Sequence, residues 1–172
     1  TDTPEEAAFR SEVRAFIERE APKPKPGQSG AEALMSNWER NQAWFKLLGQ
    51  KGWIAPAWPR EYGGAGMSTV QQFIFNEEMA TQKAPRPLHM IIGLGMAGPT
   101  LIVHGTEDQK KKYLPGMLRG EDIWCQGYSE PGAGCDLAAL QTRAVRDGDH
   151  YVVNGQKIWT TLAHMAKYMI LL

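Results

Sequence analysis

Residues 124–136 of this sequence read WCQGYSEPGAGCD, and residues 158–161 read IWTT. In the first stretch, short polar side chains lead into a Pro-Gly-Ala-Gly turn, where glycine permits a positive φ and leaves no Cβ between the amides and a ligand. Successive amides in such a turn can form a concave site for an anion such as a pyrophosphate. In the second stretch, a strand would place the indole of Trp159 and the hydroxyl of Thr161 on one face. Together they predict a site for an anionic ligand that carries a flat ring.

The residues around these two stretches have the pattern of short strands. Asp147-Gly148-Asp149 is a typical hairpin turn, and Asn154-Gly155 predicts a second one. Tyr168–Leu172 is an apolar, strand-like run without a turn or cap after it. A chain that stopped there would expose an unpaired strand edge, so we expect a fragment of a longer protein. The other expected strands are Ile123–Tyr128, Gln141–Arg146, Tyr151–Val153 and Gln156–Thr161.

The first 120 residues carry helical patterns instead. Three helices are expected to begin at a hydroxyl cap, namely Thr3, Ser68 and Thr106, because acidic or amide side chains follow each cap. A further helix is expected over about Ser36–Gln50. Helices first and strands second predict an α+β fold with segregated halves. We expect an all-α helical bundle over residues 1–120 and the start of an antiparallel β-domain over residues 121–172.

Three features of the helical half have plain structural interpretations. The loop Gly52–Gly66 is expected to be compact and pinned by its two tryptophans. Leu88–Gly105 has no Asp, Glu, Lys or Arg, but its glycines and its proline favour a buried helix over a membrane span. Lys110, Lys111 and Lys112 are expected on a solvated helix face.

The bulk composition excludes several classes of protein. Nineteen basic and nineteen acidic residues cancel, so no global field attracts nucleic acid or an anionic membrane. Cys125 and Cys135 form neither a C-x-x-C motif nor part of a His-rich metal cluster, so no metal site is expected. Two cysteines in a domain of this size, and an acidic N-terminus without a signal-peptide pattern, indicate a reducing, cytoplasmic compartment.

The order of the motifs resembles one family. The run Gln126–Asp136, followed by Asn154–Lys157 and Trp159–Thr161, is similar to the flavin-binding core of the acyl-CoA dehydrogenases. Residues 52–64 and 109–115 resemble two earlier signatures of the same family, so the resemblance covers nearly the whole chain. The sequence of residues 124–130 and 160–164 resembles that of a bacterial branch that includes large subunits of pimeloyl-CoA dehydrogenases.

The resemblance implies a set of FAD-binding residues. Ser129 matches a hydroxyl that hydrogen-bonds the flavin ring, and Thr161 one that approaches the flavin nitrogen that accepts hydride. Trp159 matches the indole that packs against the isoalloxazine. Glu130 and Asp136 resemble an acid/base pair by composition, but the resemblance makes them loop-structuring residues. The complete set implied for the cofactor is Gln126, Tyr128, Ser129, Gly134, Cys135, Trp159, Thr160 and Thr161.

Cys135 departs from the pattern. The family usually has Ser here, in contact with the flavin or the CoA ester near the pyrophosphate, so Cys135 is also the expected substrate-binding residue. Cys is a weaker donor and larger, so a backbone contact is expected to replace the side-chain hydrogen bond. A catalytic thiol is rejected because no base in the sequence pairs with it.

The activity implied is α,β-dehydrogenation of an acyl-CoA thioester in fatty acid metabolism, with FAD as cofactor and electron-transfer flavoprotein as electron acceptor. The catalytic base is expected beyond Leu172, in a C-terminal helical bundle that this chain lacks, so no catalytic residue is assigned. The family implies a homo- or hetero-oligomer, either a dimer or a tetramer.

Two other functions stay open from the sequence. An acyl-CoA oxidase shares the fold but reduces oxygen, and a non-catalytic partner subunit would keep the fold without a complete flavin site. The glycines of Gly93–Gly98 are also open to two interpretations: close helix packing, or room for a bulky or long acyl chain.

Overall fold

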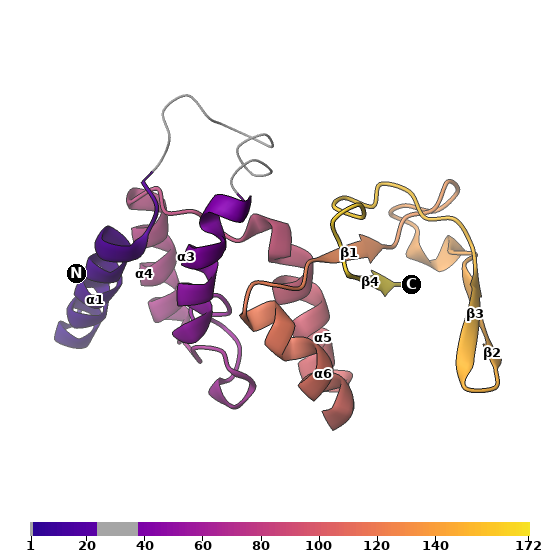
Figure 1. Cartoon of the computed structure of the whole chain (residues 1–172), viewed down its shortest axis with the longest axis horizontal. Helices are drawn as coiled ribbons and strands as arrows, with labels where there is room; N and C mark the ends of the chain where they lie inside the picture. The colour runs from indigo at the N-terminus through magenta and orange to yellow at the C-terminus, as the bar shows by residue number, and fades with distance from the viewer. Residues whose placement is uncertain (1, 24–37) are drawn as a thin grey trace. The chain divides into compact units, whose positions relative to one another are not determined.

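The computed structural model describes residues 2–23 and 38–172, with the side chains of residues 38–40 left out (Figure 1). The chain divides into two compact units, residues 1–121 and 122–172. The start of the helix expected from Ser36 and the side chain of Trp38 lie outside the described part. An all-helical unit followed by a small unit of strands confirms the α+β class.

The described part of the first unit is built from five α-helices. Short hydroxyl side chains start three of them, because Thr3, Ser68 and Thr106 each accept from the third helical amide in a reciprocal capping box. The predicted helix starts are therefore confirmed. The helices are α1 (Pro4–Glu20), α3 (Trp38–Gln50), α4 (Thr69–Thr81), α5 (Gly98–His104) and α6 (Glu107–Leu118).

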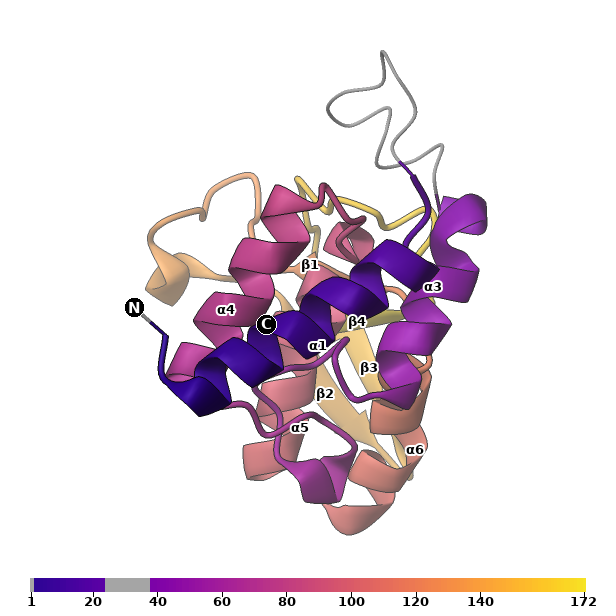
Figure 2. The same cartoon turned by 90° about the vertical axis from the view of Figure 1, so that its left-hand side faces the viewer.

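An aromatic cluster forms the core between three of these helices. Trp53 lies at its centre, with its ring centroid 5.0 Å from that of Phe16 on α1 and 5.6 Å from that of Phe75 on α4. Trp44 on α3 approaches Phe16 with ring centroids 5.4 Å apart. Figure 2 shows α1 crossing in front of α4 and α3, which is the arrangement that these contacts hold together.

The loop between α3 and α4 is pinned as expected. Trp53 and Trp58 are both buried, and the indole N–H of Trp58 donates to the carbonyl of Leu94 over 3.0 Å. A Cβ on Gly98 would lie 2.0 Å from the ring of Trp58, so this glycine is required by close packing.

The segment expected as one buried helix is buried on one side only. It continues as a 3₁₀ turn (Leu88–Met90), a π-helical segment (Gly93–Ala97) and α5. Ile91 and Val103 are exposed, so they mark the side of the segment that does not pack on the rest of the unit. Among the described residues, no helix is both long and apolar enough to cross a membrane.

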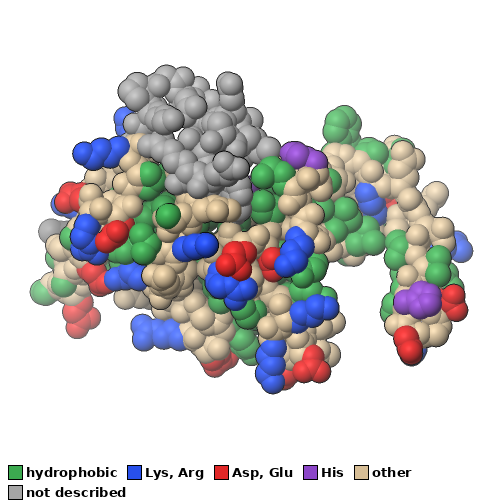
Figure 3. Space-filling model, viewed as in Figure 1, with side chains coloured by type: hydrophobic (Ala, Val, Ile, Leu, Met, Phe, Trp, Pro, Cys, Tyr) green, Lys and Arg blue, Asp and Glu red, His purple; other side chains and the backbone are tan. Residues whose placement is uncertain are grey.

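Of the three lysines expected on a solvated helix face, Lys110 is mostly buried. Lys111 and Lys112 are exposed, but the side chain of Lys110 is only 12% exposed. Its ammonium lies 5.1 Å from the ring centroid of Tyr62 and donates to Glu107. On the face of the helical unit drawn in Figure 3, basic and acidic side chains are interspersed, in line with the balanced composition.

The second unit contains two separate pairs of strands. β2 (Arg143–Asp147) and β3 (His150–Asn154) form the predicted antiparallel hairpin, with Gly148 at a φ of 59° in the turn. β1 (Trp124–Gly127) pairs with β4 (Tyr168–Leu171) in parallel, a pairing that the expected start of an antiparallel β-domain does not include. Turn residues signal hairpins, whereas a parallel pair needs a long crossover without a local signature.

The strand predicted over Gln156–Thr161 is also wrong. A two-residue hairpin turn of the Asn-Gly kind needs positive φ at both residues, and neither Asn154 nor Gly155 has it. Gly155 lies tightly against Thr142 instead, and a Cβ there would be 2.1 Å from the Thr142 hydroxyl oxygen. The chain then continues without strand pairing, and Trp159 has a φ of 57°, which is incompatible with a strand.

A buried carboxylate joins α1 to α4. Glu78 is 2% exposed, and Arg14 donates to both of its oxygens over 3.0 and 2.9 Å. Arg10 donates to the same carboxylate over 3.2 Å and also pairs with Glu77, which is exposed. These guanidinium groups lower the pKa of Glu78, and the hydrogen bonds from Arg14 make the largest contribution.

Replacing Glu78 by Ala is expected to reduce the free energy of unfolding by about 1–3 kcal/mol, because two arginines lose a buried partner but can reach water. Urea unfolding measures the change, and Glu77→Ala is the matched control, for which a loss below about 1 kcal/mol is expected. Equal losses for both variants would contradict a special role for Glu78.

Candidate functional site

The hydrogen bonds of Glu130 organise the second unit. Glu130 is 7% exposed, and its carboxylate accepts from the backbone amides of Gln141 and Thr142 over 2.7 and 2.9 Å. The Thr142 hydroxyl and the Lys157 ammonium also donate to it, over 2.5 and 2.8 Å. The carboxylate thereby ties the loop after β1 to the start of the hairpin and to the segment after it.

Lys157 completes this connection. Its side chain is 8% exposed, and its ammonium donates to the backbone carbonyl of Tyr128 over 2.9 Å as well as to Glu130. Directly beside it, the amide of Ile158 donates to the carbonyl of Ser129 over 2.9 Å. The two stretches that the sequence singled out therefore lie side by side.

The charge on Glu130 follows from these donors. The hydrogen bond from Lys157, then those from Thr142 and Gln141, hold the pKa of its carboxyl at about 2, below the ordinary 4.5. A carboxylate with four donors and such a low pKa is poorly suited to accept a proton from a substrate at neutral pH. The loop-structuring role expected for Glu130 therefore fits its surroundings better than an acid/base role.

The Pro-Gly-Ala-Gly turn is exposed and open. Its backbone is closed by a pair of bonds between Glu130 and Ala133, of 2.7 and 3.1 Å. Neither Gly132 nor Gly134 has a positive φ, so the turn does not use the left-handed conformation that glycine permits. A Cβ on either glycine would meet nothing within 4 Å, and Cys135 is exposed with a free thiol. The glycines thus leave open space above the turn.

Trp159 is the most unusual residue of the site. The residue is 85% exposed, although large aromatic residues are mostly buried in folded proteins. Its φ of 57° is costly for a bulky residue, and such strain is concentrated at functional sites. The amide of Thr161 donates to the carbonyl of Trp159 over 2.9 Å, so these residues form a tight turn and not the expected strand face.

The remaining predicted residues lie around these two segments. Gln126 is on β1 opposite Ile170, and Tyr128 and Ser129 follow that strand with partly buried side chains. Thr160 is partly buried, and its carbonyl accepts from Ala163 over 3.1 Å. The structure thus brings residues 128–130 together with residues 157–159. Gly134 and Cys135 lie in the exposed turn, and Thr161 is exposed in the turn after Trp159.

Sequence reasoning did not assign Lys157 any function. In the sequence, Lys157 is only the last residue of the Asn-Gly-Gln-Lys signature. Its pairing with Glu130, 27 residues away, leaves no pattern in the local sequence. A buried lysine in a chain is detectable from its surroundings in space but not from sequence spacing.

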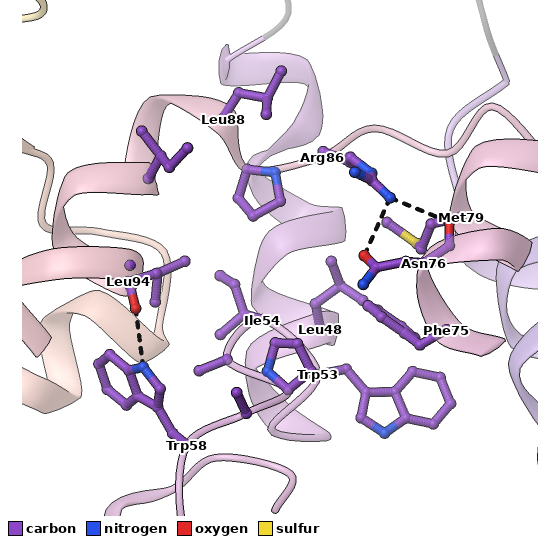
Figure 4. Close-up of a pocket in the computed structure, with 16 residues that line it drawn as sticks. Leu48, Trp53, Ile54, Trp58, Phe75, Asn76, Met79, Arg86, Leu88 and Leu94 are labelled. Carbon is purple, nitrogen blue, oxygen red and sulfur yellow. Dashed lines mark hydrogen bonds between the residues drawn. The ribbon is translucent and has the colours of Figure 1, made fainter. Parts of the chain in front are cut away.

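A second candidate site is an apolar cavity in the helical unit (Figure 4). Its volume is about 260 Å³, and its walls come from the 53–58 loop, from α4 and from residues 86–95. Gly95 is one of the lining residues, and a Cβ added there would meet only the Ile91 side chain, at 3.9 Å, so this position has room for a larger side chain. Arg86 is the charged residue of the lining, and it donates to the backbone and side-chain oxygens of Asn76 over 3.2 and 3.1 Å.

No metal centre is found in the described ranges, where no three His, Cys, Asp or Glu side chains gather closely enough to hold an ion. The candidate sites are therefore the exposed indole with its loop in one unit and the apolar cavity in the other.

The fold and this site define a class of protein in which a helical domain precedes a small β-domain. The acyl-CoA dehydrogenase N-terminal domain model matches residues 3–121, and the acyl-CoA dehydrogenase middle domain model matches residues 125–172. The chain belongs to the acyl-CoA dehydrogenase family.

Individual relatives agree with this assignment. Acyl-CoA dehydrogenase FadE26 of Mycobacterium tuberculosis is 41% identical over 168 residues, which are 97% of this chain and 41% of that protein. A chain in the crystal structure of the ChsE4-ChsE5 complex from Mycobacterium tuberculosis is 39% identical with a TM-score of 0.75, and the match covers 99% of this chain and 42% of that chain. A chain of the Tcur3481-Tcur3483 steroid ACAD is also 39% identical, with a TM-score of 0.73 and coverage of 99% and 43%. This chain thus spans about two fifths of the length of these relatives.

The low pKa of Glu130 predicts a pH dependence of stability. Because the folded carboxyl titrates at about 2 and the unfolded one at about 4.5, its stabilising contribution is complete above pH 4.5 and is lost as the pH falls towards 2. The difference in melting temperature between the wild type and Glu130→Gln should therefore be largest near neutral pH and shrink below pH 4.5. Glu5→Gln, on the exposed surface of α1, is the control, and a Glu130→Gln difference that is constant with pH would contradict the prediction.

Proposed function

We propose that this chain forms the N-terminal helical domain, residues 1–120, and the start of the β-domain, residues 121–172, of an FAD-dependent enzyme. The reaction is the removal of hydrogen from Cα and Cβ of an acyl-CoA thioester. The family membership supports the reaction class, and members of this family generally use FAD. The single observation that carries the cofactor site is the strained, exposed indole of Trp159 beside Ser129.

The residues of the site fit such a cofactor. The indole of Trp159, a residue that is 85% exposed, can pack on a flat ring system, and the open turn at Gly132 and Gly134 lets backbone amides approach a pyrophosphate. When bound, FAD supplies the hydride acceptor that no amino-acid side chain provides.

Each residue has a proposed part in holding the cofactor. The indole of Trp159 covers one face of the ring, while the hydroxyls of Ser129 and Thr161 hydrogen-bond its edge. The backbone around Gly134 and Cys135 holds the phosphates, and Cys135 also lies near the CoA ester. The other proposed cofactor-binding residues are Gln126, Tyr128 and Thr160.

The proton-abstracting base is assigned to no residue of this chain. Glu130 is held charged by four donors, and Asp136 is exposed in the loop. We propose that the base is a carboxylate in the part of the protein that this chain does not cover, because the chain spans about two fifths of its relatives.

We further propose an electron-transfer flavoprotein as electron acceptor and a homo- or hetero-oligomeric enzyme. The hetero-oligomer is supported by a 39% identical relative whose structure is a complex of ChsE4 with ChsE5. A reducing, cytoplasmic compartment is supported by the two free thiols of Cys125 and Cys135.

The decisive test is a visible absorption spectrum of the full-length protein, titrated with a panel of acyl-CoAs under nitrogen. We expect flavin bands that bleach when the correct acyl-CoA is added, because the substrate reduces the flavin. Reoxidation by air at a rate comparable to turnover would favour an oxidase. Absence of flavin, even after FAD is added, would refute the proposal and favour the non-catalytic partner subunit.

The acyl group is proposed to be bulky or long, with part of it in the cavity beside Gly95. The support is the apolar lining, the open space at Gly95 and a 39% identical relative described as a steroid ACAD. A π-helical segment forms this wall, and such segments are frequent at functional sites.

Replacing Gly95 by Leu in the full-length enzyme should shift the acyl-CoA preference towards smaller acyl groups, with at least a tenfold loss of kcat/KM for the best bulky substrate. A buried CH₂ group contributes about 0.8 kcal/mol and a tenfold change in rate corresponds to about 1.4 kcal/mol, so two displaced carbons already account for a loss of this size. Thr100→Leu adds a side chain to the exposed face of α5, outside the cavity lining, and is the control. An unchanged preference in Gly95→Leu would remove the cavity from the acyl site.

A further inference from the structure

Three hydrogen bonds lock the two halves of the proposed flavin site together. The Lys157 ammonium holds the Tyr128 carbonyl and the Glu130 carboxylate, over 2.9 and 2.8 Å. The Ile158 amide holds the Ser129 carbonyl over 2.9 Å. Ser129 is therefore fixed from both sides by one neighbouring segment, which continues directly into Trp159.

We propose that Lys157 is a positioning residue for FAD. Through Tyr128 and Glu130, its ammonium holds Ser129 and Trp159 in the geometry that receives the flavin ring. This inference rests on the proposed function and names no new step of the reaction.

The backbone of Trp159 explains why positioning is needed. A bulky residue at a φ of 57° persists only when its surroundings enforce the conformation. On one side, Lys157 and Ile158 are bonded to the loop after β1. On the other side, Leu162 is buried at a φ of 67° and accepts from Ala166 over 2.9 Å. Releasing the Lys157 side lets Trp159 relax to a negative φ and swing its indole away.

The chemistry of lysine suits this position. Its ammonium offers three donors on a flexible stem, and it reaches both a backbone carbonyl and a carboxylate. Without it, the Tyr128 carbonyl and one Glu130 oxygen lose a buried donor. The Glu130 carboxylate would then be a buried charge with neutral donors alone.

A second lysine–carboxylate pair in the same unit is a matched control. Lys167 donates to Asp122 over 2.8 Å, and its side chain is 60% exposed. This pair supports the segment beside β4, away from the 128–130 and 157–159 contacts. Lys167→Met therefore removes the same kind of interaction without releasing the proposed flavin segments.

The test compares full-length wild type with Lys157→Met, Lys167→Met and the double variant Lys157→Met/Glu130→Gln. The readouts are the dissociation constant of FAD, the visible circular dichroism of bound flavin and the melting temperature. Lys157→Met is expected to weaken FAD binding at least tenfold and to change the circular dichroism, whereas Lys167→Met changes neither.

The double variant separates positioning from folding. It removes the buried unpaired carboxylate, so the melting temperature should recover relative to Lys157→Met, while FAD binding stays at least tenfold weaker than in wild type. Recovery of FAD binding together with stability would overturn the inference, as would wild-type FAD binding by Lys157→Met. If Lys157→Met does not fold, the FAD affinity of the double variant decides alone. If the wild type binds no FAD, the proposed function itself is refuted. If the wild type binds FAD and the variants bind it equally well, only the role of Lys157 is refuted.

Discussion

The buried pair of Glu130 and Lys157 is the constraint on which the second unit depends. That unit has only two short strand pairs, and each strand has four or five residues. Strand pairing within these residues does not define the path of the loops between them, and side-chain hydrogen bonds do. Glu130 bonds to the start of the β2 segment and to Lys157, and Lys157 bonds back to the residues after β1. Three segments that are separate in sequence thereby share one charged centre.

The helical unit uses the same principle at Glu78. There, Arg10 and Arg14 on α1 donate to a carboxylate of α4 that lies 68 and 64 residues further along the chain. In both units a carboxylate buried by its donors joins segments that no local turn connects. The difference lies in what surrounds them: Glu78 lies beside an aromatic core, whereas Glu130 lies beneath an exposed loop. The ion pairs of Glu78 support a packed interface between two helices, and the ion pair of Glu130 with Lys157 supports an exposed loop.

The sequence predicts those parts of the fold that local chemistry encodes. Hydroxyl caps at Thr3, Ser68 and Thr106 act within one helical turn, so the helix starts are readable directly. The β2–β3 hairpin has its glycine turn and is likewise found. The parallel pairing of β1 with β4, by contrast, joins residues more than forty positions apart and has no local signal.

The same division applies to the candidate site. The residue types were found by resemblance, but the expected strand through Trp159 was wrong because Gly155 packs on Thr142 instead of turning. Lys157 was overlooked since its partners lie 27 and 29 residues away. The sequence indicates that Glu130 structures the loop, but its pairing with Lys157 is visible only in three dimensions.

Gly95 and Gly98 differ in the side chains that they can accept by substitution. At Gly98, any side chain would collide with the ring of Trp58 at 2.0 Å, so mutation there is blocked unless the indole is lost as well. At Gly95, the nearest atom to an added Cβ is 3.9 Å away, within ordinary van der Waals contact, so larger residues are admissible. Lineages that share this scaffold can therefore reshape the cavity by single substitutions at residue 95, while residue 98 stays glycine for as long as Trp58 does.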